Sequence, residues 1–475
     1  MMRSSLKKTD LSRRDLLKLS SLVAAQSLTG CFTPSHLTGE KSLRKPNIVI
    51  IFADDMGYGD MGCMGHPTIA TPNLDKMAAQ GIKLTQFYSA ASVCTPSRAA
   101  LLTGRLPIRS GMCSSKRRVL FPNSAGGLPE SEITIAKALK SAGYATACIG
   151  KWHLGHLQKF MPNQHGFDYY YGIPYSNDMR PTPLIENNKT IEEPANQKTL
   201  TRRYTQKAVS FIRKNKSKPF FLYFPHTFPH IPLFASAKFK DKSIRGLYGD
   251  VIEELDWSVG VILDTLRKYH LDRNTLVIFT SDNGPWLPRK LNGGSAGLLR
   301  GGKGSTWEGG MREPALAWWP GKIPPATVTA ELASTLDLFP TCLALAGVKP
   351  PTDRILDGYN ILPVLQAKQK SPRKVMFFYR GTKIYAVRSG PWKLHLIIQA
   401  GYGDKSHPQD TPLLFHLDHD PSENFDVAPK NPDVVETLLK IIEDHRATVI
   451  PVPSQLEIAL PKKRKKPKPP QKTKT

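Results

Sequence analysis

The chain has 475 residues, of which 40% are hydrophobic and 9% aromatic, so it can bury the cores of one large and one smaller domain. No stretch is as long as a transmembrane helix, and the six scattered cysteines form neither a disulfide framework nor a zinc pattern. The net charge is +27; residues 1–30 carry +4 and residues 462–474 carry +8, which leaves +15 elsewhere and favours anionic partners without naming one.

The first residues have the pattern of an export signal. Ser12–Lys18 resembles a twin-arginine signal and is followed by a short, modestly apolar run. Leu28–Cys31 resembles a bacterial lipobox, in which Cys31 would be lipidated and would attach the protein to a membrane. We therefore expect a signal over residues 1–30, a tether over 31–45, and an exported protein of the periplasm or cell envelope. The alternative is a disordered basic N-terminus with a chance arginine pair.

Alternating strands and helices follow from residue 46. Four continuous apolar runs are typical of strands that are buried on both faces, and two long segments between them are typical of helices. The runs are Ile48–Ala53, Ala145–Ile149, Phe220–Phe224 and Thr275–Thr280, and the helical segments are Glu132–Ala142 and Tyr248–Tyr269. This alternation predicts an α/β domain with a mostly parallel sheet between helices.

A second region begins near residue 370. It contains short runs typical of antiparallel strands, then a closing helix: Val375–Tyr379, Ile384–Val387, Trp392–Ile398 and Val434–Val449. We expect a large domain over 46–368, a smaller C-terminal domain over 369–456, and a basic disordered tail over 457–475. The tail is a solvated end, a grip on sulfated polysaccharide or a contact with anionic membrane.

Polar residues follow each of the four apolar runs. They are Asp54 and Asp55 after the first, Lys151 and His153 after the second, His226 and His230 after the third, and Asp282 and Asn283 after the fourth. A turn or a helix cap explains any one of them alone. Because ligands bind outside the carboxyl ends of the strands in open α/β sheets, we expect all four groups to form one cluster.

The ligand types in this cluster indicate a hard metal ion. Asp54, Asp55, Asp282 and Asn283 offer only oxygen atoms, which suit Ca²⁺ or Mg²⁺ and disfavour zinc. A cation beside a lysine and histidines makes a positive pocket for a tetrahedral oxyanion. Phosphate and sulfate esters both fit this description.

Cys94–Arg105 is the most specific segment of the chain. Pro96 can open a helix at its first turn, which places Cys94 just before a helix N-terminus, where anions are favoured. A buried structural cysteine and a thiolate nucleophile of lowered pKa are the alternatives.

This segment resembles the signature of the sulfatase family, Cys-X-Pro-Ser-Arg followed by a spacer and Thr-Gly-Arg, at every position. The resemblance extends over residues 46–455 and includes a second block, Leu299–Pro314. Gly172–Ser176 is similar to arylsulfatase A, and Pro350–Arg354 is similar to N-acetylgalactosamine-6-sulfatase. The resemblance implies an alkaline-phosphatase-like large domain with a mostly parallel mixed sheet, plus a smaller C-terminal domain with an antiparallel sheet and a helix.

The resemblance also implies the cofactors. Cys94 would be oxidised to formylglycine by a maturation enzyme, and its hydrate would attack sulfur and form a sulfated enzyme intermediate. One Ca²⁺ would be held by residue 94 and four others: Asp54, Asp55, Asp282 and Asn283.

Further roles are implied position by position. Arg98 and Lys151 would hold the hydrate and the sulfate, and His153 would be the base that releases sulfate. Lys303 and His230 would bind the ester oxygen and protonate the leaving group. Three matched residues would also contact substrate, namely Lys151, His230 and Lys303; Ser176 would hydrogen-bond sulfate or be a plain turn serine, and His226 is expected behind the site.

The substrate implied by the family and by the charge is a sulfated sugar, such as sulfated galactose or N-acetylgalactosamine, with aryl sulfates as surrogates. We expect the loops Asn177–Asn188, Trp286–Asn292 and Gly401–Asp410 to line the leaving-group pocket. The alternatives are a phosphate or phosphonate monoester hydrolase of the same fold and a non-catalytic polyanion-binding lipoprotein. Nucleic-acid binding is not expected, since no recognised module accompanies the charge.

Overall fold

The computed structural model of the protein describes residues 44–461. The expected export signal, Cys31 and the lysine-rich end beyond residue 461 lie outside the described residues, so the predictions made for them stay predictions. Within residues 44–461, no helix is long and apolar enough to span a membrane.

Residues 44–461 form two sheets. The larger has eleven strands, and its centre consists of the four strands expected from the apolar runs. They are β1 (Asn47–Ala53), β3 (Ala145–Ile149), β7 (Phe220–Pro225) and β8 (Thr275–Ser281). In the order β3-β7-β1-β8 all neighbours are parallel. Every residue of these strands is buried, which explains why their sequences are continuously apolar rather than alternating.

Further strands extend this sheet on both sides. β9 (Arg312–Trp318) pairs antiparallel with β8 and with β2 (Ile82–Tyr88), so the sheet is mixed although most of its pairs are parallel, as expected. The other strands are β4 (Tyr169–Gly172), β5 (Leu184–Glu186), β6 (Lys189–Glu192), β10 (Thr327–Thr329) and β11 (Ala333–Ser334).

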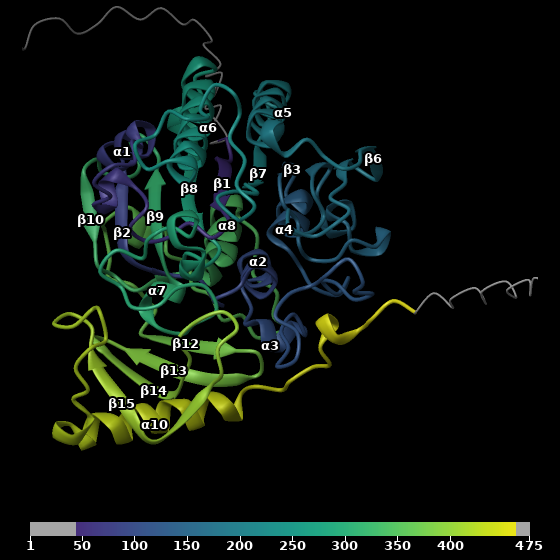
Figure 1. Ribbon diagram of the computed structural model, residues 1–475. Coiled ribbons are helices and arrows are strands. Elements are labelled where there is room, and N and C mark those ends of the chain that lie inside the picture. The colour runs from purple at the N-terminus through teal and green to yellow at the C-terminus, as the bar shows by residue number, and fades with distance from the viewer. Residues whose placement is uncertain (1–43, 462–475) are drawn as a thin grey trace, which may run out of the picture. The chain divides into compact units, whose positions relative to one another are not determined.

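Helices cover both faces of the sheet (Figure 1). Alternate residues of β1 belong to two cores: Ile48, Ile50 and Phe52 share one with α2, α4 and α8, whereas Val49 and Ile51 share the other with α1, α5 and α6. The helix bounds are α1 (Pro72–Ala79), α2 (Cys94–Thr103), α3 (Pro107–Ser110), α4 (Ile135–Ser141), α5 (Leu200–Lys214), α6 (Leu247–Lys268), α7 (Glu308–Met311), α8 (Leu338–Ala346), α9 (Leu362–Leu365) and α10 (Pro432–Ala447).

Both long helices expected in the large domain are present, but one of them starts later. α6 begins one residue before the predicted start, whereas α4 begins at Ile135 rather than at Glu132. The side-chain oxygen of Thr134 accepts a hydrogen bond from the backbone N–H of Lys137 at 3.1 Å, so Thr134 caps the helix.

The smaller sheet is antiparallel and has the order β12-β13-β14-β15, with α10 packed against it (Figure 1). Its strands are β12 (Val375–Arg380), β13 (Lys383–Ser389), β14 (Trp392–Ile398) and β15 (His407–His416). The expected antiparallel sheet and closing helix are confirmed, but β15 was not predicted. Pro408 and Pro412 interrupt its strand pattern, and prolines are tolerated in it because it is an edge strand.

A buried charge network, the Glu308 network, joins α7 to the smaller sheet. Lys393 of β14 lies 2.9 Å from a carboxylate oxygen of Glu308 and 3.0 Å from one of Glu423. His395 lies 2.7 Å from the same oxygen of Glu423. Burial alone would raise the pKa of Glu308, but the positive charges of Lys393 and Arg312 lower it to about 2. The cations of the network therefore offset the negative charge of its buried glutamates.

Candidate active site

The expected cluster forms at the carboxyl ends of the central strands, and we call it the strand-end cluster. Asp54 and Asp55 follow β1, Asp282 and Asn283 follow β8, and α2 contributes two further members. The members are Asp54, Asp55, Cys94, Arg98, Lys151, His153, His230, Asp282, Asn283 and Lys303, and all are buried. The structure thus brings together residues that are up to 249 positions apart in the sequence.

Asp54 is held by cations from two other elements. Lys151 Nζ lies 2.6 Å from Asp54 Oδ2, and a guanidinium nitrogen of Arg98 lies 3.3 Å from Asp54 Oδ1. Cys94 Sγ is 3.6 Å from the same Oδ1 atom. Arg98 also donates to Asp282 Oδ2 at 2.7 Å, so α2 is attached to both β1 and β8.

Asp55 organises the other half of the cluster. Lys303 Nζ lies 2.7 Å from Asp55 Oδ2, and Asn283 Nδ2 donates to Asp55 Oδ1 at 2.8 Å. His230 Nε2 is 3.7 Å from Asp55 Oδ2. The backbone N–H of Asp55 donates to Asp282 Oδ1 at 3.1 Å, which ties the two halves together.

The three aspartates differ in their affinity for protons. Burial raises the pKa of Asp282 to about 7 and, together with the charge of Asp54, outweighs the nearby cations. Burial also raises the pKa of Asp55 despite the charge of Lys303. Only the pKa of Asp54 is lowered, because Lys151 and Arg98 overcome the effect of its burial. The cluster is therefore short of positive charge around Asp55 and Asp282.

This shortage and an unpaired oxygen fit a hard cation. Asn283 Oδ1 is buried and has no hydrogen-bond partner among the described residues. Possible ligand atoms of Asp54, Cys94 and Asp282 all lie within 4.8 Å of one another, as do those of Asp55, Cys94 and His230. Buried carboxylate and amide oxygens around one point are the ligands of Ca²⁺ or Mg²⁺, so the cluster could hold such an ion.

Two members of the cluster have backbone conformations that are rare outside glycine. Asp55 has φ 67° and His153 has φ 60°, both in the left-handed region. Gly150, just before Lys151, has φ 133°, and a Cβ atom there would lie 1.8 Å from the carbonyl oxygen of Pro225. The close approach of β3 and β7 thus requires glycine, and the turn after β3 aims Lys151 and His153 into the cluster.

Cys94 is the first residue of α2 and not the residue before it, which corrects the predicted helix start. Val93 is the extended residue that precedes the helix, and Pro96 lies within its first turn. Cys94 is 2% exposed, and burial raises the pKa of its thiol although Lys151 and Lys303 act in the opposite direction. The unmodified side chain is a neutral thiol at neutral pH, so the thiolate alternative gains no support.

His153 has the form that a general base requires. Its Nε2 lies 2.9 Å from the carbonyl oxygen of Leu120, which can only accept, so Nε2 carries the proton. Nδ1 is then an acceptor; it is buried and lacks a partner within residues 44–461. Burial and the charge of Lys151 lower the pKa of His153 well below its ordinary value, so the ring is neutral.

His230 is held by hydrogen bonds at both ring nitrogens. Nδ1 lies 2.6 Å from the carbonyl oxygen of Ile231 and 3.0 Å from Asn177 Oδ1, and Nε2 lies 3.2 Å from Ser176 Oγ. Ser176 also accepts from Lys151 at 3.2 Å, so this serine contacts two members of the cluster. Asn177 was not singled out from the sequence beyond its place at a loop boundary.

His226 faces away from the cluster. Its ring packs against that of Phe224 at a tilt of 54°, with 4.3 Å between centroids, and its Nε2 lies 3.5 Å from Ser258 Oγ on α6. Burial lowers the pKa of His226 to about 3. It was expected to hydrogen-bond behind the site, and its partner there is a helix residue rather than a member of the cluster.

Aromatic residues from two of the expected loops lie beside Lys303. Its Nζ is 4.6 Å from the ring centroid of Trp286 and 5.9 Å from that of Tyr402. The two rings are 5.2 Å apart, and the guanidinium of Arg118 lies 4.2 Å from the centre of Tyr402. Arg118 was not predicted, because its segment carries no motif.

Comparison with known proteins agrees with this geometry. The model of the sulfatase family matches residues 46–348, and the model described as the C-terminal region of aryl-sulfatase matches residues 371–472. N-acetylgalactosamine-6-sulfatase of Mus musculus is 40% identical over an alignment that covers 93% of this chain and 94% of that protein. Arylsulfatase A of Homo sapiens is 43% identical, with 84% of this chain and 87% of that protein covered.

A solved structure supports the same assignment. The crystal structure of the PsFucS1 sulfatase from Pseudoalteromonas sp. superposes with a TM-score of 0.80 at 30% sequence identity, covering 88% of this chain and 92% of that chain. The alkaline-phosphatase-like fold expected from the resemblance is thereby confirmed. The matched models span most of the chain, and the chain therefore belongs to the sulfatase family.

Proposed function

We propose that the protein hydrolyses sulfate monoesters to an alcohol and inorganic sulfate, with the strand-end cluster as its active site. The observation that carries this proposal is the position of Cys94 among buried carboxylates and the cations of Arg98, Lys151 and Lys303. Such a pocket favours a tetrahedral oxyanion, and its charges are fixed before the substrate arrives.

Residue 94 fits the proposed formylglycine. An unmodified thiol that burial keeps neutral is a poor nucleophile, and it stands at the start of a helix inside the Cys-X-Pro-Ser-Arg signature. Oxidation of Cys94 by a formylglycine-generating partner would supply a hydrated aldehyde, whose hydroxyl is the nucleophile toward sulfur.

Asp54, Asp55, Asp282 and Asn283, with residue 94, would hold one Ca²⁺. The unpaired oxygen of Asn283 and the buried carboxylates of the three aspartates suit a hard cation at this point. When bound, the ion would supply Lewis acidity toward the sulfate oxygens.

The other members of the cluster bind and move protons. Burial would lower the pKa of Lys303, but the carboxylate of Asp55 raises it, so Lys303 carries a proton at neutral pH and can deliver it toward the leaving ester oxygen together with His230. Lys151, with Ser176, is placed to bind a sulfate oxygen. Arg98 fixes the carboxylates, and the free Nδ1 of His153 is the acceptor for a proton from residue 94.

Sulfated sugars are the proposed physiological substrates, with galactose or N-acetylgalactosamine as the sulfated residue. Support comes from the named activity of the relatives, from the positive charge of the chain, and from Trp286 and Tyr402 beside Lys303, because aromatic rings pack against sugar faces.

The proposed reaction class is tested by sulfate release. Purified protein from its native source is given an aryl sulfate, the matching aryl phosphate and 6-sulfated N-acetylgalactosamine. We expect kcat/KM to be higher for the sulfate than for the phosphate, and the sulfated sugar to be cleaved. Faster turnover of the phosphate would instead make the protein a phosphate monoester hydrolase.

Export and lipidation at Cys31 complete the proposal. The twin-arginine-like segment and the Leu28–Cys31 motif support it. Cys31→Ala is expected to move the protein from the membrane fraction into the soluble fraction, and unchanged partitioning would count against lipidation.

A further inference from the structure

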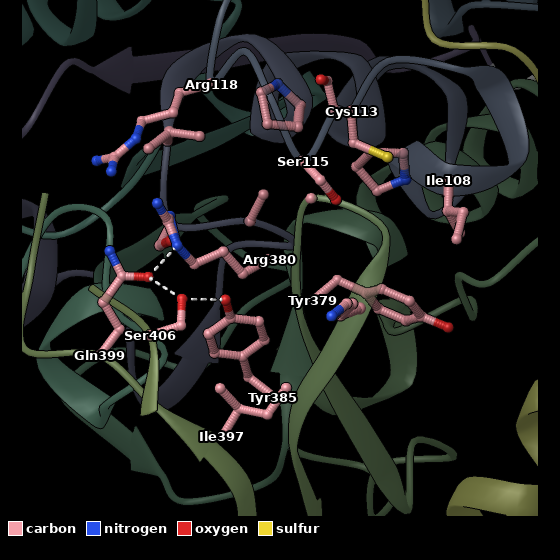
Figure 2. Close-up of a pocket in the computed structure, with 18 of the residues that line it drawn as sticks. Ile108, Cys113, Ser115, Arg118, Tyr379, Arg380, Tyr385, Ile397, Gln399 and Ser406 are labelled. Atoms are coloured by element: carbon pink, nitrogen blue, oxygen red, sulfur yellow. Dashed lines mark hydrogen bonds between the residues drawn. The ribbon is translucent and has the colours of Figure 1, made fainter. Parts of the chain in front are cut away.

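A cavity of about 690 Å³ lies between the segment that leads into α2 and the smaller sheet, and Figure 2 shows residues that line it. Val93 and Pro96, which flank the position of Cys94, form part of its wall, and β12 to β15 form the opposite wall. The cavity therefore lies along the segment that carries residue 94, although none of the ten members of the cluster is among its lining residues.

The side chains that line this cavity are strongly basic. Five are cationic and one is acidic: Lys116, Arg118, Arg380, Lys383, Lys405 and Asp404. Among the residues that the structure describes, only Lys116 of these cations forms a salt bridge, at 3.4 Å to Glu457. The cavity therefore has a surplus of uncompensated positive charge.

Arg380 is held by neutral groups alone. Its Nε donates to the side-chain oxygen of Gln399, and its Nη1 donates to the carbonyl oxygen of Gly304 at 3.1 Å. Gln399 is itself oriented by Ser406, which is hydrogen-bonded to Tyr385 at 2.6 Å, as Figure 2 shows. Burial and the charge of Arg118 lower the pKa of Arg380 to about 10. A network of neutral side chains thus fixes a guanidinium that has no counter-ion.

Arg118 likewise pairs with no carboxylate of residues 44–461. Its guanidinium stacks over Tyr402, and its Nη1 atom is buried and has no hydrogen-bond partner in the described part of the chain. Figure 2 shows the guanidinium groups of Arg118 and Arg380 on the same side of the cavity. Two like charges that lie in one cavity and form no salt bridge within residues 44–461 make a site for an anion.

These arginines are connected to the catalytic lysine. Tyr402, under Arg118, also lies beside Lys303, and Gly304, which accepts from Arg380, directly follows Lys303. The ring of Tyr402 and the backbone of Gly304 therefore separate the two arginines from Lys303, which lies on the leaving-group side of the active site.

We propose that Arg118 and Arg380 bind a second anionic group of the substrate, a carboxylate or sulfate on the sugar next to the one that loses sulfate. This inference rests on the proposed function and narrows it to sulfated saccharides that carry at least two anionic groups. It also assigns the smaller sheet, through Arg380, a part in substrate selection.

The test compares Arg118→Gln and Arg380→Gln with the unsubstituted enzyme on four substrates. One is a monosulfated aryl ester; the others are sulfated N-acetylgalactosamine disaccharides whose second sugar carries a carboxylate, a sulfate, or a neutral carboxyl-reduced group. We expect kcat/KM to fall roughly ten- to hundredfold on the doubly anionic disaccharides and less than about twofold on the aryl sulfate. Arg213→Gln, which removes an exposed charge from α5, is the matched control and should change nothing.

The pattern across the disaccharides identifies the anion. A penalty with the carboxylate that is absent from its neutral analogue assigns a carboxylate, and a penalty confined to the disulfated sugar assigns a sulfate. Equal losses on the aryl sulfate and on all disaccharides would overturn the inference, since both arginines would then act on the active site itself. Retained activity on every substrate would overturn it as well.

A binding measurement separates this inference from the proposed reaction. Calorimetric titration of the unsubstituted and the two variant proteins with both doubly anionic disaccharides should show the same ten- to hundredfold loss of affinity for at least one of them. If no sulfate is released from any substrate but this loss is found, the anion site stands and the proposed function fails. Equal affinity in all three proteins, or no binding to any of them, would overturn the anion site. The melting temperature of either variant should change little, because neither arginine forms a salt bridge within residues 44–461 and only Arg380 loses hydrogen bonds, which are to neutral groups.

Discussion

The strand-end cluster and the Glu308 network both bury lysines against carboxylates, but they differ in how far the nearby cations offset the burial of those carboxylates. In the Glu308 network both oxygens of Glu308 have partners, Lys393 at 2.9 Å and Tyr88 at 2.5 Å, and its pKa is lowered to about 2. In the strand-end cluster burial raises the pKa of Asp282 to about 7 and raises that of Asp55.

Unpaired atoms and left-handed backbone occur in both places. Asn283 Oδ1 and His153 Nδ1 of the cluster and His395 Nδ1 of the network have no partner in residues 44–461, and Asp55, His153 and Glu423 all have positive φ. The two differ in their carboxylates: cations lower the pKa of Glu308, whereas burial keeps the pKa values of Asp55 and Asp282 raised. Buried charge alone therefore does not mark a functional site; carboxylates whose burial the nearby cations do not offset do.

The largest expected effect is the loss of residue 94. Cys94→Ala should reduce kcat for sulfate release by at least about 10⁴-fold, because the nucleophile is removed while the binding charges remain. Circular dichroism should show an unchanged fold. Cys342→Ala, which alters a buried cysteine of α8 in the core, is the control and should retain activity. Substantial turnover by Cys94→Ala would show that the cluster does not act through this residue.

Matched lysine substitutions test the comparison itself. Lys393→Met should lower the free energy of unfolding by about 3–5 kcal/mol, because Lys393 is the buried cation shared by Glu308 and Glu423, and Glu308 then keeps only Arg312, at 3.3 Å, as a salt-bridge partner within residues 44–461. Lys303→Met should lower kcat by about 10²- to 10³-fold with a smaller loss of stability, since Asp55 keeps Asn283 as a donor. Denaturant unfolding and sulfate release measure the two effects. If Lys393→Met mainly lowered kcat and Lys303→Met mainly lowered the free energy of unfolding, the distinction between the two networks would be wrong.

Calcium should stabilise the protein more at high pH than at low pH. The pKa of Asp282 in the folded, metal-free protein is about 7, above its ordinary value of 3.8, so its contribution to stability is present at low pH and is lost as the pH rises through about 7. The ion requires the deprotonated form, so its affinity rises over the same range.

Scanning calorimetry after chelation measures this effect. At saturating Ca²⁺, about 100 times its Kd, we expect about 2.7 kcal/mol of stabilisation near pH 7.5 and much less near pH 5.5. Asp282→Asn should remove most of this pH dependence. A calcium effect independent of pH would show that Asp282 is not a ligand.

The smallest expected effect concerns Ser176. Its hydroxyl is 3.2 Å from Lys151 Nζ and 3.2 Å from His230 Nε2, so Ser176→Ala removes one neutral hydrogen-bonding group from the sulfate side of the cluster. We expect a loss in kcat/KM of less than about tenfold, in line with about 1 kcal/mol. Ser258→Ala, next to His226 on α6, should have no effect. An equal loss in both variants would place His226 in the active site.

The central sheet and the cluster could be predicted because their physical signals are local. β1, β3, β7 and β8 are buried on both faces, so each is a continuous apolar run, and the polar residues that follow them meet because parallel strands end on one edge. The α/β fold class implied by the family resemblance is also confirmed, by the superposition with a solved sulfatase structure.

Other features depend on tertiary contacts that no local pattern reports. β15 contains two prolines and is stabilised by its pairing with β14 and by the burial of Leu414 and Phe415. Arg118 and Asn177 lie in loops. Arg118 contacts the ring of Tyr402, and Asn177 is hydrogen-bonded to His230, and neither contact is visible in the local sequence. The start of α2 differs from the prediction by a single residue, because Val93 rather than Cys94 is the extended residue before the helix.

The most direct test of the central claim is the mass of the tryptic peptide Leu84–Arg98 from protein purified from its native source. The account predicts a mass lower by the change from thiol to aldehyde at residue 94, with the modification lost in Cys94→Ala. An unmodified thiol at full occupancy in active protein would contradict the account.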